Sequence, residues 1–105
     1  MFKLTANPTF KAKVEISIPG ATKPGIIEVE FKHQSKEKLK AFFDQMKDSE
    51  AADVEHLAKI IVGWSGVDTD YSEEALDAML DQYPAAAHEL FAAYSAELLV
   101  SKRKN

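Results

Sequence analysis

Cysteine is absent from the chain, which excludes disulfide bonds, thiolate metal sites and a cysteine nucleophile. This composition suits a reducing compartment. Internal repeats, low-complexity runs and composition breaks that would mark a linker are also absent from the 105 residues. With 46% hydrophobic residues, the chain can bury one core but is too short for two ordinary domains, so we predict a single domain over residues 1–105.

Long apolar runs are missing as well. The first residues, MFKLTANPTFKAKVEIS, lack the apolar core of a signal peptide, and no window approaches the ~20 apolar residues of a membrane-spanning helix. Basic residues are outnumbered by acidic ones, 13 to 17, which gives a formal net charge of -4 and a pI near 5.3. This balance disfavours nucleic acid and an anionic membrane as partners. We therefore expect a soluble protein whose main partner is another protein.

The motifs of common catalytic and cofactor sites are absent too. The sequence contains no GxSxG, no P-loop and no GxGxxG. His33, His56 and His88 fall in different predicted elements, and we expect each of them at the surface. Asp53 and His56 could give two metal ligands on one helix, but a site needs three or four. The sequence therefore predicts no catalytic residue, no metal and no cofactor.

An acidic segment, VGWSGVDTDYSEE at residues 62–74, invites comparison with a calcium loop. Asp68, Asp70 and Ser72 occupy the first three ligand positions of an EF-hand. However, Glu73 stands where the turn glycine is needed, and Met79 stands where the bidentate glutamate is needed. We interpret Asp70 or Ser72 as the N-cap of a helix whose first turn the neighbouring acids stabilise.

Alternating apolar and polar residues predict two strands. Residues 10–18, FKAKVEISI, and residues 26–32, IIEVEFK, alternate across the turn-rich PGATKPG. The expected inward-facing residues are Phe10, Ala12, Val14, Ile16, Ile18, Ile27, Val29 and Phe31. This pattern is typical of a β-hairpin, and two strands alone are marginally stable, so helices must cover the apolar face.

The register of this hairpin stays open, because its connection is too long to fix it. One alignment sets Lys13 opposite Glu30 and leaves Glu15 facing Glu28. Shifting the strands by two residues relieves that repulsion between carboxylates.

Helical spacing predicts four helices after the hairpin. The first follows Ser35 and ends near Lys47, and the second follows Asp48 or Ser49 and ends before Gly63. Their apolar stripes are Leu39, Phe42, Phe43 and Met46, and then Val54, Leu57, Ile60 and Ile61.

The third predicted helix begins after Ser72 and ends near Gln82, and the fourth has Pro84 in its first turn and ends near Val100. Their inner residues are Leu76, Met79, Leu80, Ala87, Leu90, Phe91, Tyr94 and Leu98. The sequence thus predicts an α+β domain with a β-hairpin part at residues 1–34, a helical part at 35–101 and a basic tail at 102–105.

Five aromatic residues of the C-terminal part could anchor either a core or a protein interface: Trp64, Tyr71, Tyr83, Phe91 and Tyr94. Phe91 and Tyr94 match a helical stripe, which favours the core. Trp64 lies between two glycines in a predicted loop. Its indole either closes the space between the second and third helices or anchors a partner.

The C-terminal run GWSGVDTDYSEEALDAMLDQYPAAAHELFAAYSAEL, residues 63–98, resembles the tail assembly chaperones of long, flexible-tailed bacteriophages. The resemblance rests on five short features of the sequence. They are Gly63-Trp64-x-Gly66-Val67, Tyr71-Ser72, the Leu76, Leu80 and Tyr83-Pro84 series, Ala93-Tyr94 with Leu98, and the basic end KRKN.

The resemblance implies a non-enzymatic chaperone that acts in the host cytoplasm during virion assembly and is absent from the finished particle. Such chaperones bind the tape measure protein, keep it soluble and help to recruit tail tube subunits. Many are made in two forms, the longer by ribosomal frameshifting, and this chain would be the short form. The implied partners are the tape measure protein, the tail tube protein through the longer form, and other copies of the chain.

Candidate protein-binding residues are aromatic or apolar side chains of the C-terminal half: Trp64, Val67, Tyr71, Tyr83 and Tyr94. A different class remains open, namely a small structural adaptor or completion protein that is retained in the particle. Two further alternatives are an enzyme, if carboxylates such as Glu55 and Asp77 converge, and a DNA-binding regulator, if basic residues share one face.

Overall fold

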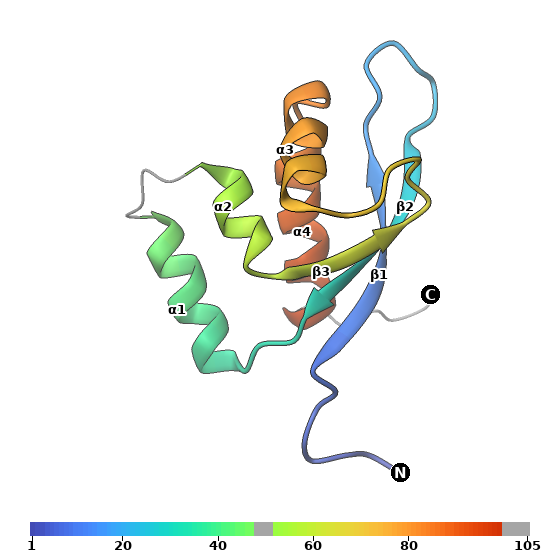
Figure 1. Ribbon diagram of the computed structural model, residues 1–105. Coiled ribbons are helices and arrows are strands. Elements are labelled where there is room, and N and C mark those ends of the chain that lie inside the picture. Colours follow the sequence, from blue (N-terminus) through green and yellow to red (C-terminus); the bar gives the residue numbers. More distant parts are fainter. Residues whose placement is uncertain (48–51, 100–105) are drawn as a thin grey trace.

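A computed structural model describes residues 1–47 and 52–99 of the chain. It confirms an α+β domain with an N-terminal β-hairpin and helices that follow it (Figure 1). The elements in chain order are β1 (Thr9–Ile16), β2 (Gly25–Lys32), α1 (Lys36–Lys47), α2 (Asp53–Ala58), β3 (Ile61–Ser65), α3 (Glu73–Gln82) and α4 (Ala86–Leu99).

The hairpin adopts the alignment shifted by two residues. β1 and β2 are antiparallel, with Lys13 opposite Glu28 and Lys11 opposite Glu30. Opposite charges therefore face each other on the exposed side of the sheet, and Glu15 lies across from Ile26 instead of a carboxylate. On the other side Ala12, Val14, Ile16, Ile27, Val29 and Phe31 are buried as predicted, whereas Ile18, beyond the end of β1, is 39% exposed.

A third strand lies where the sequence pattern predicts the end of the second helix. α2 stops at Ala58, and residues 61–65 turn back to pair antiparallel with β2, which becomes the central strand of the order β1-β2-β3. The prediction of a helix up to Gly63 was therefore wrong, and Trp64 belongs to a strand instead of a loop. Ile60, Ile61 and Val62 are β-branched, and such residues favour strands over helices.

The pairing of β3 with β2 contains a β-bulge. Glu30 pairs with Gly63, but Phe31 pairs with Ile61, so Val62 has no partner and is 44% exposed. Beyond the bulge Trp64 pairs with Val29, whose side chain is buried. Directly paired residues share a face of the sheet, so Trp64 lies on the same face as the core.

The helix bounds follow the predicted caps closely. α1 begins after Ser35, whose hydroxyl accepts a hydrogen bond from the Lys38 amide at 3.3 Å. α4 begins at Ala86, so Pro84 precedes the helix and does not lie in its first turn. α2 begins at Asp53 after Ala52, and the cap candidates Asp48 and Ser49 lie outside the described residues, as does the predicted basic tail.

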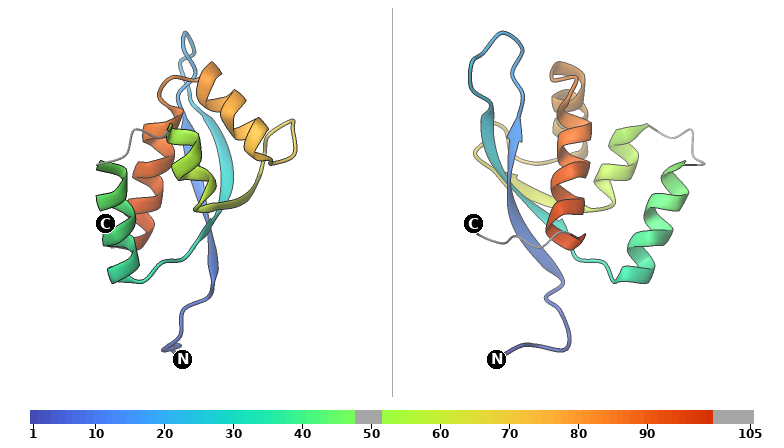
Figure 2. Two further views of the ribbon diagram at one scale, coloured as in Figure 1. Left: turned by 60° about the vertical axis from the view of Figure 1, so that its left-hand side comes forward. Right: turned by 180° about the vertical axis from the view of Figure 1, so that it is seen from behind.

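The helices lie together on one side of the hairpin, as the view from behind shows (Figure 2). α4 packs along β1, and α2 lies against α3, α4 and β3. Tyr94 of α4 is fully buried at the centre, where its ring centroid lies 5.1 Å from Phe31 and 6.3 Å from Phe42. The core thus joins β2, α1 and α4 around one aromatic ring.

Candidate functional site

Trp64 organises the segment that connects β3 to α3. Its indole N–H donates a hydrogen bond to the carbonyl oxygen of Thr69 at 2.8 Å, and its ring meets Tyr71 edge to face at 5.1 Å. Gly66 permits the turn between them, because its φ of 84° lies in the left-handed region that favours glycine. Burial, with a further contribution from Glu73, raises the pKa of Tyr71.

α3 follows this segment and supplies a second wall. Its N-cap is Ser72, as predicted, whose hydroxyl accepts a hydrogen bond from the Ala75 amide at 3.0 Å. Leu76 points into the core and is fully buried. Ala75, Ala78, Met79 and Gln82, which recur at helical spacing, form a second stripe that faces the hairpin.

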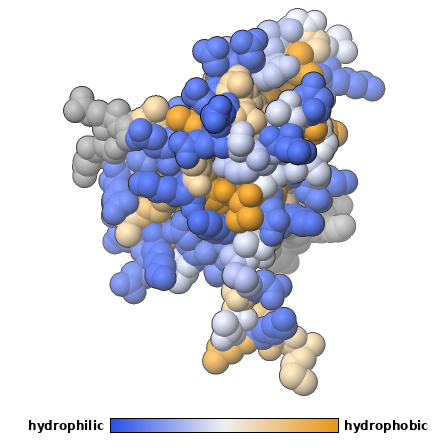
Figure 3. Space-filling model, in the orientation of Figure 1, coloured by the Kyte–Doolittle hydropathy of each residue, from blue (hydrophilic) through white to orange (hydrophobic). Residues whose placement is uncertain are grey.

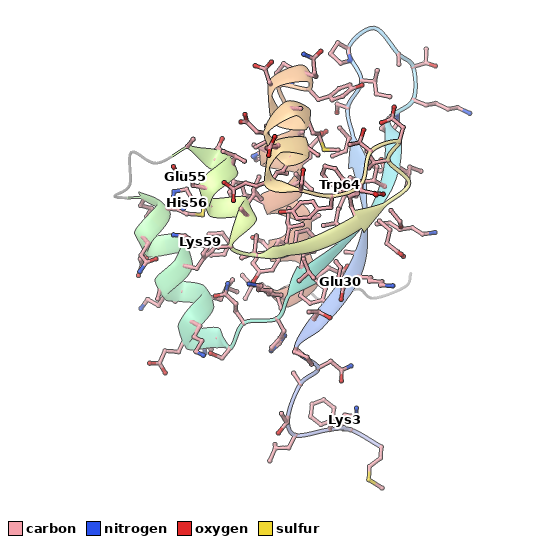
Figure 4. All side chains as sticks on the ribbon, in the orientation of Figure 1. Lys3, Glu30, Glu55, His56, Lys59 and Trp64 are labelled. Carbon is pink, nitrogen blue, oxygen red and sulfur yellow. The ribbon has the colours of Figure 1, made fainter. Side chains whose placement is uncertain are left out.

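A groove of about 320 Å³ lies between these two walls and the hairpin. We call it the hairpin–α3 groove. The hairpin contributes Ile16, Ile18, Gly25 and Ile27, the connecting segment contributes Trp64 and residues 66–69, and Tyr83 closes the end of α3. Figure 4 shows Trp64 on the side of β3 that is nearer to α3. The lining is predominantly apolar, which is the character of a binding surface.

Three of the five candidate residues, Trp64, Val67 and Tyr83, line the hairpin–α3 groove. Tyr71 lies behind Trp64, in contact with its ring. The structure does not bring Tyr94 to this surface. It is fully buried, and its hydroxyl donates a hydrogen bond to the Lys32 carbonyl at 3.0 Å. No partner can reach it in this fold, and we correct its assignment to the core.

The hairpin wall and the small residues of α3 are not among the predicted site residues. Ile16 and Ile27 are apolar at strand spacing, which predicts a place in the core, but the groove also exposes part of that face. Ala75 and Ala78 indicate a possible groove in the sequence, because small residues on one helix face leave space beside the helix. Whether that space is a groove depends on the element that lies next to the helix, which the sequence does not reveal.

Apolar side chains are exposed elsewhere too. Phe2 and Leu4, in the segment before β1, are 91% and 97% exposed. This segment lies at the lower end of the molecule, away from the β1–β2 connection (Figure 1), and apolar atoms are visible at that end in Figure 3. It contributes no wall to the groove.

His56 differs from its predicted place at the surface. It is 5% exposed, because it lies on the side of α2 that meets Phe42 of α1, with ring centroids 6.4 Å apart. Within residues 1–47 and 52–99, no group of three or more His, Asp or Glu residues could hold a metal ion. No helix in that part of the chain is long and apolar enough to cross a membrane.

The described residues form a small α+β domain with an open, mainly apolar groove. The comparison with protein families is more specific. The family model described as phage tail assembly chaperone matches residues 1–105, and the chain belongs to this family. No curated protein and no solved structure matches the chain.

The turn at Gly66 gives a testable prediction for the groove. Gly66→Ala should lower the free energy of unfolding by about 1 to 2 kcal/mol, because an L-residue is strained at positive φ. Steric collision is not the cause, since the nearest atom to an added Cβ is the Ile26 carbonyl oxygen at an ordinary 3.5 Å. Urea unfolding of the purified variant measures the change.

Gly63→Ala is the matched control for this experiment. An added Cβ at Gly63 meets no atom within 4 Å, and its φ is not positive. We expect the control to be as stable as the parent chain or slightly more stable, since alanine restricts the unfolded state. Equal stabilities of the two variants would contradict the assigned role of Gly66.

Proposed function

We propose that this chain is a non-enzymatic chaperone that binds the tape measure protein and keeps it soluble during assembly of the phage tail. One observation carries the proposal: a member of the tail assembly chaperone family presents an open apolar groove walled by Trp64, Val67 and Tyr83. The resemblance at residues 63–98 falls largely on the segment that builds this groove.

A physical mechanism links the groove to this task. A long helical protein that leaves the ribosome exposes apolar stripes, which associate with one another unless they are covered. A groove of this size covers only a few side chains, so a single contact is weak. Many copies along one tape measure chain gain strength through avidity, and each copy can still be displaced as the tail tube closes around the tape measure protein.

The proposal includes further partners and a place of action. We propose that copies of the chain associate with one another, because β1 and β3 are the outer strands of the sheet and carry unpaired backbone groups. Tail tube subunits are recruited through a longer, frameshifted form of the protein. The chaperone acts in the host cytoplasm and leaves before the particle is complete.

Co-expression with the tape measure protein tests the proposal. The tape measure protein should be soluble with the parent chain and should aggregate without it. Trp64→Ala should reduce the soluble yield several-fold, because the indole both lines the groove and holds the segment at Thr69. Densitometry of soluble and pelleted tape measure protein gives the readout.

A second variant separates loss of binding from loss of folding. Ala78→Gln fills the groove from an exposed helix position, and Ala41→Gln makes the same change at an exposed position of α1. We expect the first to lower the soluble yield and the second to leave it unchanged. Equal yields with both variants would contradict the groove as the binding site. Detection of the chain in purified virions would instead favour a structural adaptor.

A further inference from the structure

Charge is distributed very unevenly around the hairpin–α3 groove. Among the residues that line it, Asp68 carries the only charge, and no lysine or arginine takes part. Residues 60–99 as a whole contain no lysine or arginine, although the chain has 13 of them. The charged residues of this stretch are all acidic: Asp68, Asp70, Glu73, Glu74, Asp77, Asp81, Glu89 and Glu97.

Two of these acids border the groove along α3. Ala78 lines the groove, and Glu74 and Asp81 lie one turn before and one turn after it on the same side of the helix. Both acidic residues are exposed. Asp68, on the connecting segment, lines the groove and is exposed as well. Carboxylates therefore occur both on α3 and on the connecting segment beside the apolar lining.

The stability of α3 explains only part of this arrangement. Acids in the first turn, such as Glu73 and Glu74, are stabilised by the helix dipole. Asp81 is in the last turn, where the dipole disfavours a carboxylate, and α3 has no basic residue there. Asp68 lies outside the helix altogether. The helix dipole therefore accounts for Glu74 but not for Asp68 or Asp81.

We propose that the hairpin–α3 groove binds a basic amphipathic helix, in which one apolar stripe is flanked by lysine or arginine. The apolar stripe packs on Trp64, Val67 and Met79, and the flanking cations pair with Asp68 of the connecting segment and with Glu74 and Asp81 of α3. This inference rests on the proposed function and specifies which segments of a tape measure protein the chaperone selects. Acidic helices bind more weakly, because their side chains meet carboxylates of the same charge.

Two synthetic helical peptides test the inference directly. Both carry leucine at positions i, i+3, i+4 and i+7, and they differ only in flanking residues, which are lysine in one peptide and glutamate in the other. Trp64 is the only tryptophan of the chain, so its fluorescence reports occupancy of the groove. We expect the lysine peptide to bind about tenfold more tightly at low salt. The preference should shrink at 1 M salt, where charges are screened within about 3 Å.

A charge-matched pair of variants locates the effect. Glu74→Gln combined with Asp81→Asn should reduce the preference for the lysine peptide to about twofold or less. Glu37→Gln combined with Asp44→Asn removes the same charge from exposed positions of α1 and should leave the preference unchanged. Similar effects of the two pairs would show a response to net charge and would overturn the assigned contacts.

Other outcomes separate this inference from the proposed function. Equal affinity for the two peptides, with intact solubilisation of the tape measure protein, would overturn the inference and leave the chaperone function standing. A fluorescence change that follows protein concentration without peptide, together with an increase in particle size, would assign the groove to a second copy. In a third outcome, the chain prefers the lysine peptide and yet fails to keep the tape measure protein soluble. That result would reject the tape measure protein as the partner, and the proposed binding of a basic helix would stand.

Discussion

Tyr94→Ala should lower the free energy of unfolding by about 3 to 5 kcal/mol, the range for removal of a buried aromatic ring. The ring is fully buried, and its centroid lies 6.0 Å from Phe10 in a stacked arrangement as well as close to Phe31 and Phe42. Its removal leaves a cavity where β1, β2, α1 and α4 meet. Because small domains are stable by only about 5 to 15 kcal/mol, much of the chain would unfold under mild denaturant.

Tyr94→Phe distinguishes the ring from its hydroxyl. It keeps the packing but removes the donor to the Lys32 carbonyl, and the expected loss is about 1 kcal/mol. Burial, partly offset by a hydrogen bond with Gln34, raises the pKa of Tyr94 to about 12, which agrees with a hydroxyl that stays protonated in the core. Guanidinium unfolding followed by circular dichroism measures both variants. A Tyr94→Ala chain as stable as the Tyr94→Phe chain would contradict this account of the core.

The parts of the fold that were predictable have strong local signals. The hairpin strands alternate over eight residues each, so their period is unambiguous. α3 begins after Ser72 and ends at Gln82, as predicted, because an N-cap and first-turn acids mark its start. The hairpin register could not be predicted, because both alignments set a lysine opposite Glu30. In the observed one Lys11 pairs with Glu30 and Lys13 with Glu28, and Glu15 no longer faces a carboxylate.

β3 was missed because a short apolar run fits two periods. Val54, Leu57, Ile60 and Ile61 have helical spacing, and they are all buried or partly buried in the structure as well. α2 ends at Ala58 because the edge of β2 provides backbone partners for the residues that follow. The backbone amide of Lys32 in β2, for example, donates a hydrogen bond to the Ile60 carbonyl at 2.7 Å. The β-branched residues at 60–62 favour a strand, but the long-range partner β2 decided the conformation.

The candidate site was predictable to the extent that it is local. Trp64, Val67 and Tyr83 stand within twenty residues of one another in sequence, and all three line the groove. Tyr94 has the same residue type as Tyr83 but a different environment, which helical spacing could not separate. The hairpin wall comes from residues that precede α3 by more than forty positions in the sequence, and only the packing of the sheet brings it to α3.

Leu76→Ala should lower the free energy of unfolding by about 2 to 5 kcal/mol. Leu76 is fully buried and fixes α3 to the core, while the opposite side of the same helix carries the groove residues Ala75 and Ala78. The cost combines lost apolar burial with the cavity that remains. Since α3 also carries Glu74 and Asp81, a looser helix should weaken peptide binding without any change at the groove surface.

Leu99→Ala is the matched control, since it makes the same substitution near the end of α4, where the side chain is 62% exposed. A loss within about 0.5 kcal/mol is expected there, as for most surface substitutions. Urea unfolding followed by Trp64 fluorescence measures the free energy of unfolding of both variants. Trp64 is a suitable probe because it lines the same groove as α3. Equal losses for the two variants would mean that α3 is not anchored through Leu76, and the groove would then need another support.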